Sequence, residues 1–153
     1  MPKNYLLIYS EQLATEIELL CQSLSKIKDC SNTVFQIRKS SSSVFANITE
    51  AQYPQSLPDM LSKLKIARKE CFETESWLKL LFGTGQISEE IFKEKRNLCG
   101  RIRRILTASC ITIEKKIEQK AVTLIVSGRL DTQTAPELEN ELDAVVVGIK
   151  DLT

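Results

Sequence analysis

Apolar residues in this chain recur at alternating steps of three and four, and this spacing constrains the fold more than any other feature. Such steps keep side chains on one face of an α-helix, because the helix turns once every 3.6 residues or so. The first segment of this kind spans about residues 4–28 and carries Leu13, Ile17, Leu20, Leu24 and Ile27 on one face. We therefore expect a helix there with a single buried stripe.

A run of four serines, Ser40–Ser43, falls inside the second periodic segment and raises a choice between a flexible linker and a helix. The alternation continues through the run, since Val34, Ile37, Ser41, Val44 and Ile48 keep the same steps. No glycine or proline lies between Asp29 and Gln52, whereas flexible linkers are rich in glycine. The run is therefore predicted to be helical, from about Ser31 to Tyr53-Pro54, with small side chains that let a neighbouring helix approach closely.

Two more helices are predicted after this one. The third begins at the cap Ser56-Leu57-Pro58-Asp59 and ends at Gly83-Thr84-Gly85, and its expected inward residues are Leu57, Leu61, Leu64, Ala67, Cys71, Thr74, Leu78 and Leu81. The fourth begins at Ser88-Glu89-Glu90, reaches to about Lys116, and directs Ile91, Leu98, Ile102, Ile105 and Ser109 inward. Four helices with short connections predict an all-α, antiparallel up-and-down four-helix bundle over residues 4–117.

Composition excludes several functional classes. Hydrophobic residues make up 42% of the chain and charged residues 27%, which is typical of a soluble globular protein. No apolar run approaches the roughly 20 residues of a membrane span. The apolar stretch after Met1 is too short for a signal peptide, so we expect a cytoplasmic protein without a membrane partner.

The five cysteines are scattered without a CxxC pair, and the chain has no histidine. We interpret the cysteines as reduced, mostly buried residues and expect neither a metal site nor a cofactor. The missing histidine also removes the commonest general base.

The run NITEAQYPQSLPDMLSKLKIARKECFETESWLKLL, with QIRKSSSSVFANI overlapping its start and ISEEIFKEKRNLCGRIRRILTASC after it, resembles a known family. This is the four-helix bundle family named for proteins encoded in intervening sequences of bacterial 23S ribosomal RNA genes. The resemblance covers about residues 4–117 and is most specific at residues 36–50, 67–70 and 73–75. It implies a homo-oligomer, typically a pentameric ring, without known enzymatic activity. A related bundle is the accessory protein of diversity-generating retroelements, where a basic ring binds nucleic acid and a reverse transcriptase.

Four polar residues in these segments, Arg38, Asn47, Glu50 and Glu73, have two interpretations. They form a polar ligand site, or they form a hydrogen-bond network that fixes the register of the helices; we favour the network. The nearby carboxylates Glu70, Glu73 and Glu75 could support acid–base chemistry. No glycine-rich phosphate loop, nucleophile elbow or metal-ligand spacing accompanies them.

Charge is unevenly distributed, although the net charge is only +1. Residues 1–117 contain 18 Lys and Arg against 13 Asp and Glu, and residues 118–153 contain 3 against 7, which gives a basic bundle and an acidic tail. The fourth helix carries Lys93, Lys95, Arg96, Arg101, Arg103 and Arg104, followed by Lys115 and Lys116. The first six are candidate residues for weak, sequence-nonspecific binding of RNA or DNA. A solvated charged face explains them too, and no interleaved aromatic residues indicate base stacking.

The tail differs in character from the bundle. In AVTLIVSGRLDTQTAPELENELDAVV, residues 121–146, the β-branched run Val122–Val126 predicts a strand, and a helix with Leu130, Leu138, Leu142 and Val145 on one stripe follows a turn at Ser127-Gly128. The stretch resembles the opening strand and first helix of a STAS domain of the anti-sigma factor antagonist type, whose phosphorylated serine would lie beyond Thr153. We expect residues 118–153 to be a truncated STAS-like appendage without switch activity. The sequence leaves three alternatives for this appendage: it docks on the bundle, its strand pairs with the same strand of another subunit, or it is a disordered remnant.

Two functional hypotheses follow. The first is a non-enzymatic oligomeric bundle that serves as an interaction or scaffold protein for a protein partner or a nucleic acid, with a nucleic-acid-binding accessory protein as the alternative. The second is an enzyme that uses the carboxylates of the third helix. We disfavour the enzyme, because a compact bundle has no evident pocket-forming element.

Overall fold

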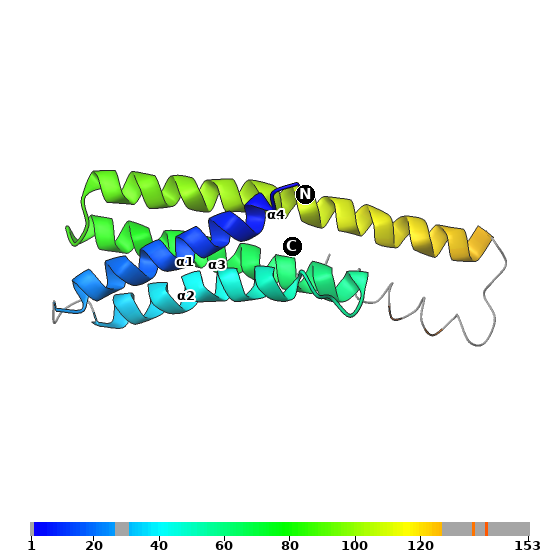
Figure 1. The fold of residues 1–153 in the computed structure, drawn as a ribbon, viewed down its shortest axis with the longest axis horizontal. Coiled ribbons are helices and arrows are strands. Elements are labelled where there is room, and N and C mark those ends of the chain that lie inside the picture. Colours follow the sequence, from blue (N-terminus) through cyan, green and yellow to red (C-terminus); the bar gives the residue numbers. More distant parts are fainter. Residues whose placement is uncertain (1, 27–30, 127–135, 137–139, 141–153) are drawn as a thin grey trace.

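The computed structural model describes residues 2–26, 31–126, 136 and 140. Within this part of the chain four helices form, and each is antiparallel to the helix before it (Figure 1). They are α1 (Tyr5–Leu24), α2 (Ser31–Glu50), α3 (Leu57–Gly83) and α4 (Glu89–Val126). This arrangement confirms the all-α class and is consistent with the predicted up-and-down bundle. None of these helices is apolar over a length that would cross a membrane.

Local sequence signals set most of the helix ends. The Ser56 hydroxyl accepts a hydrogen bond from the Asp59 backbone N–H at 3.2 Å, and the Ser88 hydroxyl accepts one from Ile91 at the same distance. Each hydroxyl satisfies a backbone donor that has no partner inside its helix. After α3, Gly85 takes a φ of +72°, a left-handed conformation that favours glycine. The predicted caps and the glycine stop are therefore confirmed.

The serine run is part of α2, as predicted. Ser40 and Ser41 are buried, together with all four apolar residues of the predicted stripe, Val34, Ile37, Val44 and Ile48. The Thr74 hydroxyl of α3 donates to the Ser40 hydroxyl at 2.8 Å, and Ser40 lies 3.2 Å from the carbonyl of Ile37. Small side chains therefore bring α2 close to α3, and their hydroxyl groups are satisfied inside the bundle.

Each pair of neighbouring helices is joined by an ion pair. Together these ion pairs show how the helices are aligned along one another. Arg38 binds Glu18 between α2 and α1, and Lys63 binds Glu50 between α3 and α2. Lys65 binds Glu114 between α3 and α4, and Lys95 of α4 binds Glu16 of α1. These contacts show that α4 lies beside both α3 and α1.

The strand predicted at Val122–Val126 is wrong, because α4 continues without interruption to Val126. No glycine or proline lies between Gly100 and Gly128 to stop the helix. The buried residues Ile113, Ile117 and Ala121 also extend the helical stripe at steps of four. Burial along this stripe outweighs the weak β preference of the valines. The structure therefore gives no support to the STAS-like strand, and the predicted tail helix after it lies outside the described ranges apart from residues 136 and 140.

The predicted inward stripes of α4, α1 and α3 each differ in part from the buried residues of the structure. In α4 the buried positions after Ile102 are Leu106, Cys110, Ile113, Ile117 and Ala121. The predicted inward residues Ile91, Ile105 and Ser109 are only half-buried. In α1 Cys21 is buried, and its neighbour Leu20 is half-buried. In α3 the predicted residues from Leu61 to Leu81 are all buried, and Leu57 is half-buried. Ile27, at the end of the first predicted stripe, lies outside the described residues.

Candidate nucleic-acid interface

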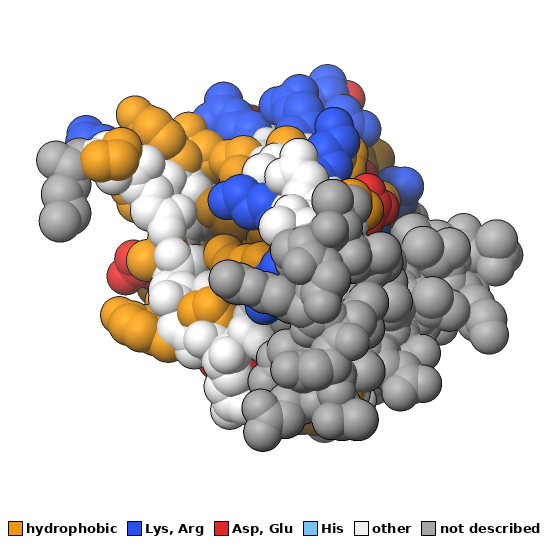
Figure 2. All heavy atoms as spheres, turned by 90° about the vertical axis from the view of Figure 1, so that its right-hand side faces the viewer, with side chains coloured by type: hydrophobic (Ala, Val, Ile, Leu, Met, Phe, Trp, Pro, Cys, Tyr) orange, Lys and Arg blue, Asp and Glu red, His pale blue; other side chains and the backbone are white. Residues whose placement is uncertain are grey.

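Figure 2 shows Lys and Arg side chains gathered along the upper edge of the molecule, where α4 lies in Figure 1. Not all of the predicted residues are available to a ligand there. Lys95 is turned toward α1, where its Nζ lies 2.7 Å from Glu16 Oε2 and its side chain is only 12% exposed. Lys93 is exposed, and it binds Glu89 one turn earlier on α4 at 2.6 Å. These two residues therefore have carboxylate partners inside the chain.

The pairing of Lys95 with Glu16 shifts the pKa values of both groups. Burial by itself raises the pKa of Glu16, but hydrogen bonds donated by Lys95 and Gln12 outweigh it, so the pKa lies below its ordinary value. Burial lowers the pKa of Lys95, but its hydrogen bonds to Glu16 and Glu94 raise the pKa above the ordinary value. Both groups are thus stabilised in their charged forms.

The other four candidate residues surround one open pocket between α3 and α4. This pocket has a volume of about 440 Å³, and its lining consists of Glu75, Lys79, Arg96, Asn97, Gly100, Arg101, Arg103 and Arg104. Five of these eight residues are cationic, and one is acidic. We call the five cations, Lys79, Arg96, Arg101, Arg103 and Arg104, the basic face.

One of the five cations is neutralised within the chain. Arg103 forms an ion pair with Glu75, the acidic residue of the lining. In the described part of the chain, Lys79, Arg96, Arg101 and Arg104 have no ion pair. Their positive charges are therefore not neutralised by a carboxylate in the described part of the chain.

Aromatic rings lie beneath two of the guanidinium groups. The Arg103 guanidinium lies 4.5 Å from the centre of the Phe72 ring, and that of Arg96 lies 5.3 Å from the centre of the Phe92 ring. Phe92 stacks on Phe82 with 4.8 Å between ring centres. Cation–π contact holds the guanidinium groups in place. The exposed ring in this region belongs to α3, outside the fourth-helix segment for which no interleaved aromatic residues are predicted: Phe72 is 54% exposed and contacts Arg103.

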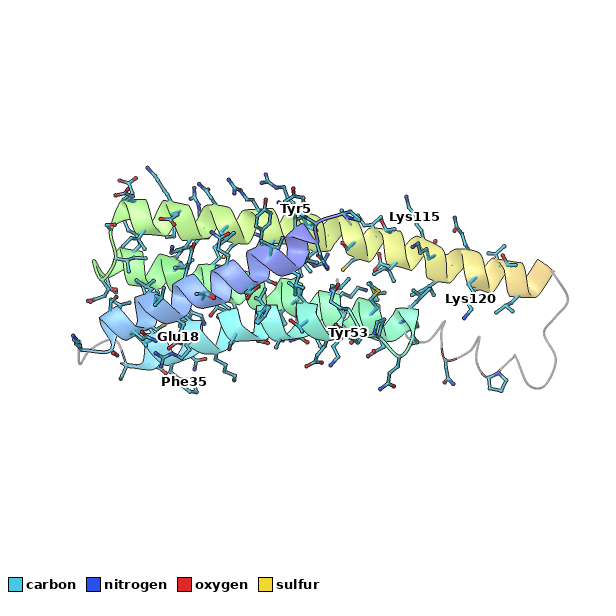
Figure 3. All side chains as sticks on the ribbon, viewed as in Figure 1. Tyr5, Glu18, Phe35, Tyr53, Lys115 and Lys120 are labelled. Atoms are coloured by element: carbon cyan, nitrogen blue, oxygen red, sulfur yellow. The ribbon has the colours of Figure 1, made fainter. Side chains whose placement is uncertain are left out.

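Lys115 and Lys116 are exposed further along α4, beyond the N-terminal end of α1. Figure 3 shows Lys115 on the outer side of α4, pointing away from the other helices. Lys115 follows Arg104 by three helical turns and shares its side of the helix. A long anion could therefore contact both residues.

The four residues of the predicted polar network have separate partners. Arg38 binds Glu18, and Glu50 binds Lys63. The Asn47 amide donates to the carbonyl of Ser43 at 2.9 Å, and Glu73 accepts a hydrogen bond from the Trp77 indole at 3.3 Å. Arg38 and Glu50 thus fix neighbouring helices, whereas Asn47 and Glu73 bind within their own helices. These contacts do not bring the four residues together.

Of the three carboxylates of α3, Glu70 and Glu73 lie close enough for their charges to interact, whereas Glu75 binds a residue of α4. Burial, and then the negative charge of Glu73, raise the pKa of Glu70. Glu75 is held by Arg103. Among the described residues, no three His, Cys, Asp or Glu side chains are placed to hold a metal ion.

The described cysteines, Cys21, Cys71, Cys99 and Cys110, are buried and form no disulfide. A hydrogen bond with Cys71, together with burial, strongly raises the pKa of Cys99. A thiol with a raised pKa is a poor nucleophile at neutral pH, because the thiolate is the reactive form. Cys30 lies outside the described residues.

Sequence reasoning missed Lys79, Asn97, Gly100 and Phe72 as members of this region. Asn97 and Gly100 could have been found from the helical spacing, since Asn97 lies four positions before Arg101 and Gly100 four positions before Arg104 on the same helix. Lys79 and Phe72 belong to α3, and no local signal relates them to α4. Their position depends on the register between the two helices.

Comparisons with known proteins agree with this fold. The sequence model of the family described as 23S rRNA-intervening sequence protein matches residues 6–108, which is well over half of the chain. Among solved structures, the chain is similar to a crystal structure of a protein of unknown function from the S23 ribosomal protein family of Bacteroides thetaiotaomicron. The two chains are 34% identical, the match covers 69% of this chain and 97% of that one, and the TM-score is 0.66. No match was found among curated proteins. Because the family match spans most of the helical bundle, the chain belongs to the 23S rRNA-intervening sequence protein family.

Proposed function

We propose that this protein is a non-enzymatic interaction protein that binds nucleic acid through the basic face without reading its sequence. The observation that carries the proposal is the clustering of Lys79, Arg96, Arg101 and Arg104 around one open pocket without ion pairs in the described chain. Unpaired cations on one face attract the phosphate backbone of RNA or DNA. A cytoplasmic location, as expected from the sequence, belongs to this proposal.

The chemistry of the face favours phosphate over base recognition. Guanidinium groups bind phosphate oxygens through paired hydrogen bonds, and such contacts carry no sequence information. The exposed Phe72 ring beside Arg103 offers a stacking surface to an unpaired base, and stacking accepts every base. We therefore expect single-stranded RNA to bind at least as tightly as duplex DNA.

Charge reversal tests the proposal. The double variant Arg101→Glu/Arg104→Glu should lose most of its affinity for a labelled single-stranded RNA, measured by fluorescence anisotropy across a salt series. The slope of log affinity against log salt should fall by about 0.7 for each lost single-strand contact. The matched control, Lys26→Glu/Lys39→Glu, changes the net charge equally at exposed positions of the α1–α2 side and should bind nearly as well as the parent. Equal losses in both variants, or no binding by the parent at low salt, would refute the proposal.

We also propose that the protein is a homo-oligomer, with the pentamer implied by its family resemblance. A feature of α1 supports this proposal. Its outer side carries Tyr5, Ile8 and Leu19, which are all exposed, with the uncharged Gln12 and Thr15 between them. These five residues recur at steps of three and four and form one stripe, which we call the α1 stripe. A helix face without charge and with three large apolar side chains is suited to burial against another subunit.

A further inference from the structure

Gly100 lies well inside α4, where glycine weakens a helix relative to alanine. The backbone does not require glycine there, because the described glycine with a positive φ is Gly85. Packing does not require it either. A Cβ atom at Gly100 would meet only Arg103 Nη2, at 4.0 Å. Within the described bundle, therefore, nothing uses the space that the missing side chain leaves.

This space lies at the centre of the basic face. Arg96, Asn97, Arg103 and Arg104 lie three or four positions from Gly100, so they surround it on the same side of α4. Arg101 and the α3 residues Lys79 and Glu75 complete the lining. The glycine thus exposes a bare patch of helix surface in the middle of a ring of long, mostly cationic side chains.

The charge around Gly100 is unbalanced. Glu75 is occupied by Arg103, which leaves three guanidinium groups and the Lys79 ammonium group around the pocket without an acidic partner in the described chain. Mutual repulsion of these cations is relieved when an anion enters. Cationic side chains of α4 on both sides of Gly100, and Lys79 of α3, can reach an anion that lies against Gly100.

We propose that the pocket over Gly100 is a subsite for one backbone phosphate of a nucleic acid, an inference that rests on the proposed function. Arginine side chains match phosphate oxygens in geometry, and the absent side chain lets the phosphate approach the helix. A regularly charged polymer can also contact Lys115 on the same side of α4 while one phosphate occupies the pocket. Gly100 therefore sets how closely the nucleic acid approaches the bundle.

Filling the pocket tests this subsite without changing any charge. Gly100→Leu adds a side chain in open space and improves helix propensity, so the variant should fold and melt at or above the parent temperature by circular dichroism. Its affinity for labelled oligouridine should fall several-fold, and its salt slope should fall by about 0.7, the value for one single-strand contact. Gly100→Ala is the matched control, because it makes the same helix change with one methyl group and should bind much closer to the parent.

The outcomes separate this subsite from the proposed function. If Gly100→Leu binds oligouridine with the parent affinity and slope while Arg101→Glu/Arg104→Glu does not bind, the subsite is refuted and the basic face stands. If neither variant loses affinity, both ideas fail. A lower native mass of Gly100→Leu would also refute the subsite, because the space would then serve contact between subunits.

Competition identifies the source of the phosphate. Polyphosphate should displace oligouridine from the parent more effectively than inorganic phosphate at equal phosphorus concentration, because a single phosphate occupies only the pocket. Tighter competition by inorganic phosphate would overturn the proposal in favour of a free phosphate ligand. Stronger displacement by polyglutamate than by polyphosphate would overturn it in favour of an acidic protein partner.

Discussion

At the scale of single residues, Lys95 shows how a cation expected on a binding surface becomes part of the fold. It lies in the predicted basic segment, yet its side chain bridges α4 and α1 through Glu16. A largely buried charge that loses its partner is costly, whereas an exposed ion pair contributes little. Lys95 is therefore expected to affect stability more than binding.

Replacing Lys95 by methionine should lower the free energy of unfolding by about 1–3 kcal/mol, because Glu16 is then left half-buried without its cation. Urea denaturation measures this change. Lys93→Met is the control, since the pair of Lys93 with Glu89 is exposed, and it should change stability by less than about 0.5 kcal/mol. Equal effects of the two variants would contradict the structural role of Lys95.

The same pair predicts a pH dependence. The folded state lowers the pKa of Glu16, so its ionisation stabilises the fold above the usual glutamate pKa of about 4.3. That contribution is lost as the pH falls through the lower, folded value. The difference in unfolding free energy between the parent and Glu16→Gln should therefore be largest near neutral pH and shrink in acid. A difference that stays constant down to acid pH would show that Glu16 is not selectively stabilised as an anion.

The hydroxyl contact between Thr74 and Ser40 is a second residue-scale determinant. Thr74→Val keeps the shape but removes the hydrogen bond between α3 and α2, and should lower the free energy of unfolding by about 1 kcal/mol. Thr112→Val is the matched control, because the Thr112 hydroxyl bonds only to the carbonyl one turn earlier on an exposed face. Chemical denaturation of the two variants should separate them clearly.

At the scale of helices, the end of α4 is helical although its local sequence favours a strand. Its last residues are β-branched and predict a strand in isolation, yet they follow a long helix whose buried stripe continues through Ala121. Extending an existing helix costs much less than starting a new element, because nucleation is the unfavourable step. The end of α4 is therefore determined by what precedes it.

Substitutions at the exposed Val122 test this assignment. In a helix, Val122→Ala should raise the free energy of unfolding by up to about 0.5 kcal/mol, and Val122→Gly should lower it. In a strand, both changes would be destabilising, because alanine and glycine are poor strand residues. Urea denaturation gives the order of stability of the parent and the two variants, and circular dichroism gives their helix content. If the parent is more stable than Val122→Ala, the residue lies in a strand.

At the scale of the whole molecule, the bundle separates two surfaces. The basic face belongs to α3 and α4, whereas the α1 stripe is uncharged and lies on a different helix. The proposed binding and the proposed assembly can therefore be tested by separate substitutions.

Native mass spectrometry should detect an oligomer of the full chain that dissociates in Ile8→Glu/Leu19→Glu, because charges at these positions resist burial. Ile111→Glu places the same change at an exposed residue of α4 and should keep the oligomer. A shortened chain without residues 127–153 should also keep it. Loss of mass in the shortened chain alone would show that the tail, and not the α1 stripe, drives assembly.

The sequence by itself determined that four helices form and fixed most of the inner faces of α2 and α3. Apolar spacing placed the buried residues of α2 and α3, and the caps at Ser56 and Ser88 with the glycine after α3 marked the turns, because these signals act between residues close in the chain. The tertiary structure decided what depends on register between helices. It turned Lys95 toward α1, paired Arg103 with Glu75, and brought Lys79 into the pocket over Gly100 and the Phe72 ring against Arg103. Such contacts join residues far apart in the chain, and their partners are fixed only when the helices pack against one another.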